Sequence, residues 1–161
     1  MEKTLYIRSG SRYRPAKGVE ILEAASYVKA REFEASRPQL IESAQAQTFL
    51  IGQLRHCLEE YFGVVYLDKQ MRVISFEKAF RGTIDGSSVH PREIIREVLD
   101  RNAASVIIAH NHPSGYPQPS DPDLVITQRL ASVLAMIDVR IIDHIIVGAN
   151  VCFSFAESGL L

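Results

Sequence analysis

The sequence predicts an α/β fold of the α+β kind, in which helices flank a mixed β-sheet. Segments with an apolar residue at every third or fourth position, the helical period, alternate with short β-branched runs typical of strands. Two of these runs flank the polar turn Asp68-Lys69-Gln70, which indicates a β-hairpin and therefore antiparallel pairing. With 161 residues, the chain can bury a substantial core within one domain.

Residues 1–45 are expected to be an appendage to a core domain formed by residues 46–161. Residues 1–17 carry one acidic and five basic side chains, which indicates a flexible basic arm. The basic residues are Lys3, Arg8, Arg12, Arg14 and Lys17. Charges this widely spread are typical of a solvated tail, and a contact with nucleic acid or a partner is the alternative. A helical period from Val19 to Phe33 ends at the break Ser36-Arg37-Pro38.

The first half of the core domain is predicted to contain a helix, a β-hairpin and a third strand. The helix covers about 46–61 and is expected to end at Gly63. Its apolar stripe consists of Leu50, Leu54, Leu58 and Tyr61. The hairpin strands are 64–67 and 72–76, and the third strand is 78–84, ended by the turn Asp85-Gly86.

The second half of the core domain is predicted to contain two helices and three or four strands. Pro91 lies at a tolerated first-turn position of a helix that faces inward through Ile94, Ile95, Val98 and Leu99. The apolar run 104–109 predicts a strand that is buried on both faces. A long helix then begins near Ser120, and 139–148 and 151–155 supply the last strands.

Two histidines and an aspartate near the end of the buried strand have the spacing of a metal site. His110 and His112 are two residues apart, so on a strand they share a face, while Asn111 faces the other way. Asp123 lies in the first turn of the next helix, close to the end of the strand. Two imidazoles and one carboxylate that leave a fourth position for water are the layout of a catalytic Zn²⁺ site.

A structural interpretation exists for each of these residues. Ser120 followed three positions later by Asp123 resembles a capping box, which explains both residues without any metal. Ordinary loop polarity explains His110 and His112 taken one at a time. The convergence of three donors favours the metal. Unless it is wholly engaged as a cap, the Ser120 hydroxyl can donate a hydrogen bond toward a developing oxyanion.

A zinc site of this kind needs a neighbouring carboxylate as general base. The residues ahead of the histidines offer Glu77, Glu93 and Glu97, and the sequence does not rank them firmly. Glu93 and Glu97 belong to a helix surface, where charge is common. Glu77 lies among strand residues, where acidic side chains are depleted, which favours it.

Other residues of ligand type are interpreted structurally. His90 is expected to be a local cap or surface group, with a ligand role as the alternative. Asp143-His144 interrupts an apolar strand as a polar pair, with support of the metal site as the alternative. Cys57 and Cys152 lie far apart in apolar surroundings and are expected to be buried thiols. No charged leader and no apolar run of about 18 residues is present, which predicts a soluble cytoplasmic protein that makes no membrane contact.

The motif His110-Asn111-His112-Pro113 followed by Ser120-x-x-Asp123, with an acidic residue upstream, resembles the signature of JAMM/MPN-type zinc hydrolases. Segments that narrow the similarity to the RadC family over about 47–161 are Phe80-Arg81-Gly82-Thr83, 89–93, 109–115 and 143–148. Longer RadC proteins carry an N-terminal helix-hairpin-helix module. Its glycine-containing hairpins are not found before Gln47, so the chain is similar to the short members typical of mobile elements.

The resemblance implies a JAMM/MPN fold, which is cytidine-deaminase-like, and the following roles. His110, His112 and Asp123 hold Zn²⁺, Glu77 is the general base, and Ser120 stabilises the tetrahedral intermediate. The implied activity is that of a zinc metallopeptidase that cleaves a peptide or isopeptide bond of a substrate the sequence does not name.

Two other functions stay open. The first is a DNA-repair-associated accessory protein with a structural or vestigial zinc site. The balance of 18 basic and 19 acidic residues, with a pI near 6.5, gives this alternative little support because nucleic-acid binding favours a basic surface. The second is a folded domain with an unused polar loop. The oligomeric state is not predicted.

Overall fold

The computed structural model describes residues 6–9, 11–22, 24–25, 37–82 and 89–161. Contacts divide the chain into two compact units, residues 1–37 and residues 38–161. The part of the expected helix beyond residue 25, the end of the expected third strand at residues 83–84 and the turn Asp85-Gly86 lie outside the described residues.

The N-terminal unit contains a β-hairpin where the sequence predicted a flexible arm. Strand β1 (Tyr6–Ser9) pairs antiparallel with β2 (Arg12–Pro15). Residues 18–22 and 24–25 are helical. Arg14 forms an ion pair with Glu20 at 2.6 Å, and this partner lowers the pKa of the Glu20 carboxyl to about 2. The sequence analysis counted the basic charges of this segment without the glutamate that pairs with one of them.

The larger unit is built on a five-stranded mixed sheet in the order β4-β3-β5-β6-β7. The strands are β3 (Tyr61–Leu67), β4 (Val73–Arg81), β5 (Ser105–Asn111), β6 (Arg140–Val147) and β7 (Cys152–Ser154). The β5–β6 pair is parallel and the other pairs are antiparallel. The α+β fold predicted from the sequence is therefore confirmed.

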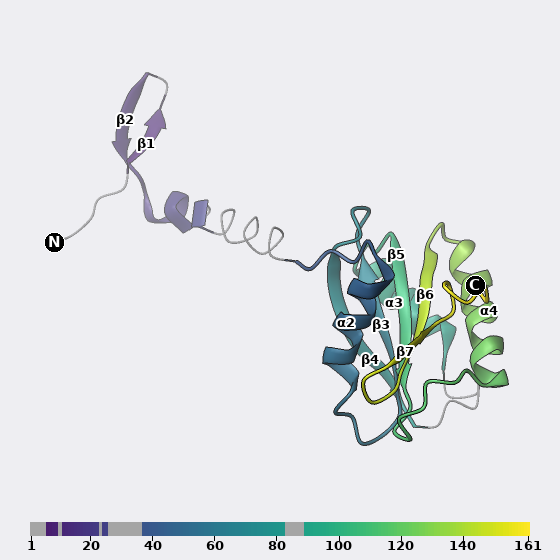
Figure 1. The fold of residues 1–161 in the computed structure, drawn as a ribbon. Helices are drawn as coiled ribbons and strands as arrows, with labels where there is room; N and C mark the ends of the chain where they lie inside the picture. Colours follow the sequence, from purple (N-terminus) through teal and green to yellow (C-terminus); the bar gives the residue numbers. More distant parts are fainter. Residues whose placement is uncertain (1–5, 10, 23, 26–36, 83–88) are drawn as a thin grey trace. The chain divides into compact units, whose positions relative to one another are not determined.

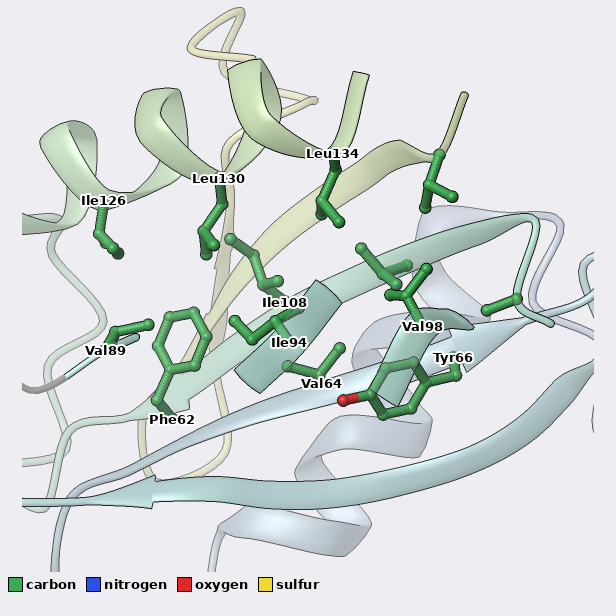
Figure 2. Close-up of a cluster of buried hydrophobic side chains, with 13 residues drawn as sticks. Phe62, Val64, Tyr66, Val89, Ile94, Val98, Ile108, Ile126, Leu130 and Leu134 are labelled. Atoms are coloured by element: carbon green, nitrogen blue, oxygen red, sulfur yellow. The ribbon is translucent and has the colours of Figure 1, made fainter. Parts of the chain in front are cut away.

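Helices cover both faces of this sheet (Figure 1). Helix α2 (Ser43–Leu54) packs on one face, and α3 (Pro91–Asp100) and α4 (Asp121–Ala135) pack on the other. Figure 2 shows α4 directing Ile126, Leu130 and Leu134 toward the sheet. Every residue of β5 is buried, as expected for a central strand covered on both sides. This buried strand carries the candidate site at its carboxyl end.

Two element boundaries differ from the sequence prediction. Helix α2 ends at Leu54, and Leu58, predicted to belong to its apolar stripe, is 93% exposed. The expected break between two strands at Glu77 does not occur, because Val73–Arg81 forms one strand. β4 is an edge strand of the sheet and most of its residues are at least partly exposed, so it accommodates a glutamate without a break.

Gly63 was expected to end a helix but lies inside β3, where packing requires a glycine. A Cβ atom at this position would lie 2.7 Å from a ring carbon of Phe76. We expect Gly63→Ala to lower the free energy of unfolding by about 1–3 kcal/mol, as overpacking does. Urea denaturation measures this change.

Gly52→Ala is the matched control for this substitution. Gly52 lies in α2, and nothing is within 4 Å of its added Cβ. Alanine there is expected to stabilise the protein by up to about 1 kcal/mol, because glycine is unfavourable within helices. Equal effects of the two substitutions would contradict the packing role of Gly63.

The two cysteines are half-buried, whereas the sequence predicted buried thiols. Burial raises the pKa of the Cys152 thiol to about 11, so this thiol is protonated at neutral pH. Among the helices within the described ranges, none has the length and apolar character needed to cross a membrane.

Candidate metal centre

His110 is the penultimate residue of β5 and is fully buried against the face covered by α3 and α4. His110 lies opposite Phe62 of β3 in the sheet. Its ring therefore points to the same face of the sheet as the apolar side chain of Phe62. Its Nδ1 lies 2.9 Å from Nε2 of His144. Its Nε2 faces away from His144, toward His112 and Asp123.

His112 follows the end of β5 and is half-buried. Its backbone N–H donates to the Val147 carbonyl at 2.9 Å, which holds it beside β6. The ring nitrogen Nδ1 lies 2.7 Å from the Tyr116 carbonyl. A carbonyl oxygen can only accept, so Nδ1 of His112 carries the proton and Nε2 keeps its lone pair.

Asp123 is brought to the histidines by the start of α4. The N-terminal cap holds one of its oxygens: Oδ2 accepts from the Ser120 backbone N–H at 2.8 Å and from the Ser120 hydroxyl at 2.6 Å. The other oxygen, Oδ1, lies 3.3 Å from Nε2 of His110. The capping box and the metal site are therefore not alternatives, since one carboxylate serves both with different oxygens.

His110 lies between the other two side chains, and Asp123 is not among the residues whose ligand atoms all lie within 4.8 Å of one another. The Nε2 atoms of His110 and His112 are 3.0 Å apart, and the Asp123 oxygen is 3.3 Å from the first of them. Ligand atoms in a tetrahedral zinc site with bonds of 2.0–2.1 Å are about 3.3 Å from one another. Both contacts of His110 have about this length, and imidazole nitrogens and carboxylate oxygens are ligands that Zn²⁺ binds. The donor types therefore fit Zn²⁺.

Glu60, which the sequence analysis did not single out, joins this cluster. One ligand atom from each of Glu60, His110 and His112 lies within 4.8 Å of the others. Because β3 and β5 are antiparallel and Phe62 lies opposite His110, residues just before Phe62 lie beside those just after His110. Locating Glu60 required this register, and the only sequence signal was an acidic residue directly before a buried strand.

Asn111 fixes the segment that carries Glu60. Its side-chain oxygen accepts from the Tyr61 backbone N–H at 2.9 Å, and its amide donates to the Glu59 carbonyl at 2.9 Å. The residue between the two histidines thus faces away from them, as predicted from strand alternation, and secures the chain on both sides of Glu60.

The three glutamates considered as general base lie together elsewhere. Glu77, Glu93 and Glu97 line a pocket of about 110 Å³, and no lining residue of this pocket belongs to the histidine cluster. Glu77 accepts from Arg101 at 3.1 Å and lies opposite Val64 in the sheet. Within the part of the chain that is described, the group able to hold a metal contains none of the three.

The remaining polar candidates have the following surroundings. His90 is exposed and precedes α3, and its ring contacts Phe80 edge-on. Asp143 accepts from the Ser154 hydroxyl at 2.6 Å and from the Ala156 backbone N–H at 3.0 Å. Burial raises the pKa of the Asp143 carboxyl. His144, in contrast, contacts His110 directly.

Burial predicts an acid sensitivity of the metal-free chain. It lowers the pKa of His110 to about 4, and it also lowers the pKa of His144. Unfolding restores ordinary values near 6.5, so the unfolded chain binds more protons between these pH values. We expect the free energy of unfolding to fall by about 1–3 kcal/mol as the pH drops from 6.5 to 4. Urea titrations in chelator measure it, and an unchanged midpoint would contradict the buried neutral imidazoles.

Comparisons with known proteins place the chain in a described family. The family model described as RadC-like JAB domain matches residues 40–160. A UPF0758 protein of Nitrosococcus oceani is 52% identical over 122 residues, which are 76% of this chain and 54% of that protein. A UPF0758 protein of Coxiella burnetii is 50% identical over 143 residues, 87% of this chain and 64% of that protein.

The chain spans between about half and two thirds of the length of these relatives. The family model covers most of the larger unit, including the mixed sheet, its helices and the candidate metal centre. From this match and the identity to the relatives, the chain belongs to the RadC family and carries its RadC-like JAB domain.

Proposed function

We propose that the chain is a zinc-dependent hydrolase of peptide or isopeptide bonds. The observation that carries this proposal is that Nε2 of His110 lies 3.0 Å from Nε2 of His112 and 3.3 Å from an Asp123 oxygen. His110, His112 and Asp123 would hold Zn²⁺ and leave a fourth position for water, which is the arrangement of a catalytic zinc site.

Bound zinc would supply a Lewis acid that polarises the carbonyl and acidifies a water molecule. Glu60 is our candidate for the general base in place of Glu77, because its carboxylate lies beside the two imidazoles. It takes the proton from the attacking water and passes it to the leaving amine. The Ser120 hydroxyl donates a hydrogen bond to Asp123 and so orients that carboxylate. Its role at the oxyanion stays a prediction, which requires the hydroxyl to turn away from Asp123.

A cleft of about 310 Å³ adjoins His112 and offers room for a peptide segment. It is lined by Leu54–Leu58 after α2, by the loop after β5 and by Gly148-Ala149. A Cβ at Gly148 would lie 2.4 Å from the Gly115 carbonyl oxygen, so glycine there permits the loop to approach β6. The cleft is half polar in character, which suits an extended backbone better than an apolar ligand.

The proposal is tested with the 161-residue chain loaded with zinc and freed of excess metal. Its substrates are a mixture of quenched peptides and peptides joined through lysine ε-amides. We expect about one zinc per chain and hydrolysis that a chelator abolishes and added zinc restores. Zinc content below about a tenth of an equivalent would contradict the proposal.

A second candidate, nucleic-acid binding, is favoured by one feature of the N-terminal hairpin. Tyr6 and Tyr13 are 61% and 73% exposed, and Tyr13 pairs with Arg8 across the hairpin. Exposed aromatic rings beside arginines can stack on bases. Binding to single-stranded DNA would then weaken steeply with salt and fall when residues 1–17 are removed. Binding that does not depend on salt would count against it.

A further inference from the structure

A buried chain of polar side chains extends from the metal centre into α4. Nδ1 of His110 lies 2.9 Å from Nε2 of His144, and Nδ1 of His144 lies 2.6 Å from the Thr127 hydroxyl. That hydroxyl is 2.5 Å from the backbone carbonyl of Asp123. His144 and Thr127 are at most 1% exposed, so each contact is made out of reach of bulk water.

The direction of every hydrogen bond in this series of side chains follows from its last acceptor, the backbone carbonyl of Asp123. The Asp123 carbonyl can only accept, so the Thr127 hydroxyl donates to it. The hydroxyl oxygen then accepts from Nδ1–H of His144, whose Nε2 is left as an acceptor. Nε2 of His144 in turn accepts from Nδ1–H of His110. The Nε2 lone pair of His110 is thereby directed at the metal centre.

We propose that Thr127 and His144 are positioning residues that hold His110 in the tautomer able to ligate zinc. This inference rests on the proposed zinc site. This series of hydrogen bonds, the polar relay, also links two proposed ligands that lie on different elements. His144, which orients the His110 ring, is anchored through Thr127 to the backbone of Asp123. The ring of His144 stacks on Phe155 with centroids 4.5 Å apart, which fixes its orientation.

A methyl group in place of the Thr127 hydroxyl would reverse the directions of these hydrogen bonds. Without an acceptor at Thr127, Nδ1–H of His144 is buried and unsatisfied, so the imidazole gains by moving its proton to Nε2. The proton would then point at Nδ1 of His110 and force the proton of His110 onto Nε2. A protonated Nε2 cannot bind a metal.

Thr127→Val and Thr127→Ser form a matched pair for the test, because valine keeps the shape and serine keeps the hydroxyl. Zinc affinity is measured by competition with a chromophoric chelator. We expect valine to weaken binding by about 10–100-fold, the effect typical of residues that orient metal ligands, and serine to stay within about threefold of the unmodified chain. A valine variant with unchanged zinc affinity would overturn the proposal.

Nitrogen NMR of the metal-free, ¹⁵N-histidine-labelled chain reads the tautomers directly and needs no variant to fold. The relay predicts that His110 and His144 both carry their proton on Nδ1. A proton on Nε2 of either ring would overturn it. If the chain binds no zinc, the proposed function fails, while the tautomers still decide the relay.

Discussion

Replacing Glu60 by glutamine is expected to remove hydrolytic activity while zinc stays bound. Glutamine has nearly the shape of glutamate, but its amide cannot accept and return a proton. Loss of a general base typically costs about 10²–10⁴-fold in rate. The measurement is the turnover rate on the quenched peptide mixture, together with the zinc content of the same preparation.

Glu77→Gln is the matched control, since it makes the same chemical change on the neighbouring strand. Glu77 is 38% exposed and bound to Arg101, and such pairs contribute only about 0–1 kcal/mol to stability. We expect its turnover rate to remain within about threefold of the unmodified chain. Loss of the general base itself would lower the rate by at least about a hundredfold. The reverse result, loss with Glu77→Gln and retention with Glu60→Gln, would restore Glu77 as the base.

Replacing His112 by alanine is expected to have the largest effect on metal binding. It removes one of three protein ligands and leaves His110 and Asp123 as an incomplete set. Because loss of a group that merely orients a ligand costs about 10–100-fold, loss of the ligand itself should cost more than about 100-fold in zinc affinity. Calorimetric titration with zinc at constant pH measures the change.

His56→Ala provides the control for nonspecific histidine binding. His56 is exposed and lines the cleft beside His112 without belonging to the metal-ligand group. Zinc affinity should be unchanged in this variant. Similar losses in both variants would mean that zinc binds to surface histidines, and the proposed centre would be wrong.

Local patterns were sufficient to predict the sheet and to bring His110 and His112 together. Strand alternation placed His110 and His112 on one face, because side chains two apart point the same way whatever the rest of the fold does. The spacing Ser120-x-x-Asp123 predicted the start of α4, and the cap that it forms is present. Both inferences depend only on residues close in the sequence.

Glu60 was missed because its position depends on a long-range register. It approaches the histidines only because β3 pairs antiparallel with β5 and Phe62 lies opposite His110. The preference for Glu77 used the rarity of glutamate in strands, which does not hold on an edge strand with accessible side chains. His144 was left open for the same reason, since its contact with His110 crosses from β6 to β5.

The end of α2 was wrong for a different physical reason. An apolar stripe continues in the sequence past Leu54, but Leu58 lies on the surface and Tyr61 already begins β3. Periodicity alone does not distinguish a helix that continues from a turn that happens to carry an apolar residue at the same spacing.

Anomalous diffraction at the zinc edge, from crystals of the chain grown with one equivalent of zinc, tests the central claim most directly. We expect one strong peak about 2.0–2.1 Å from Nε2 of both His110 and His112 and from one Asp123 oxygen, with Glu60 nearby but unbound. A peak elsewhere, or a site closed by Glu60 as a fourth protein ligand, would contradict a hydrolytic centre.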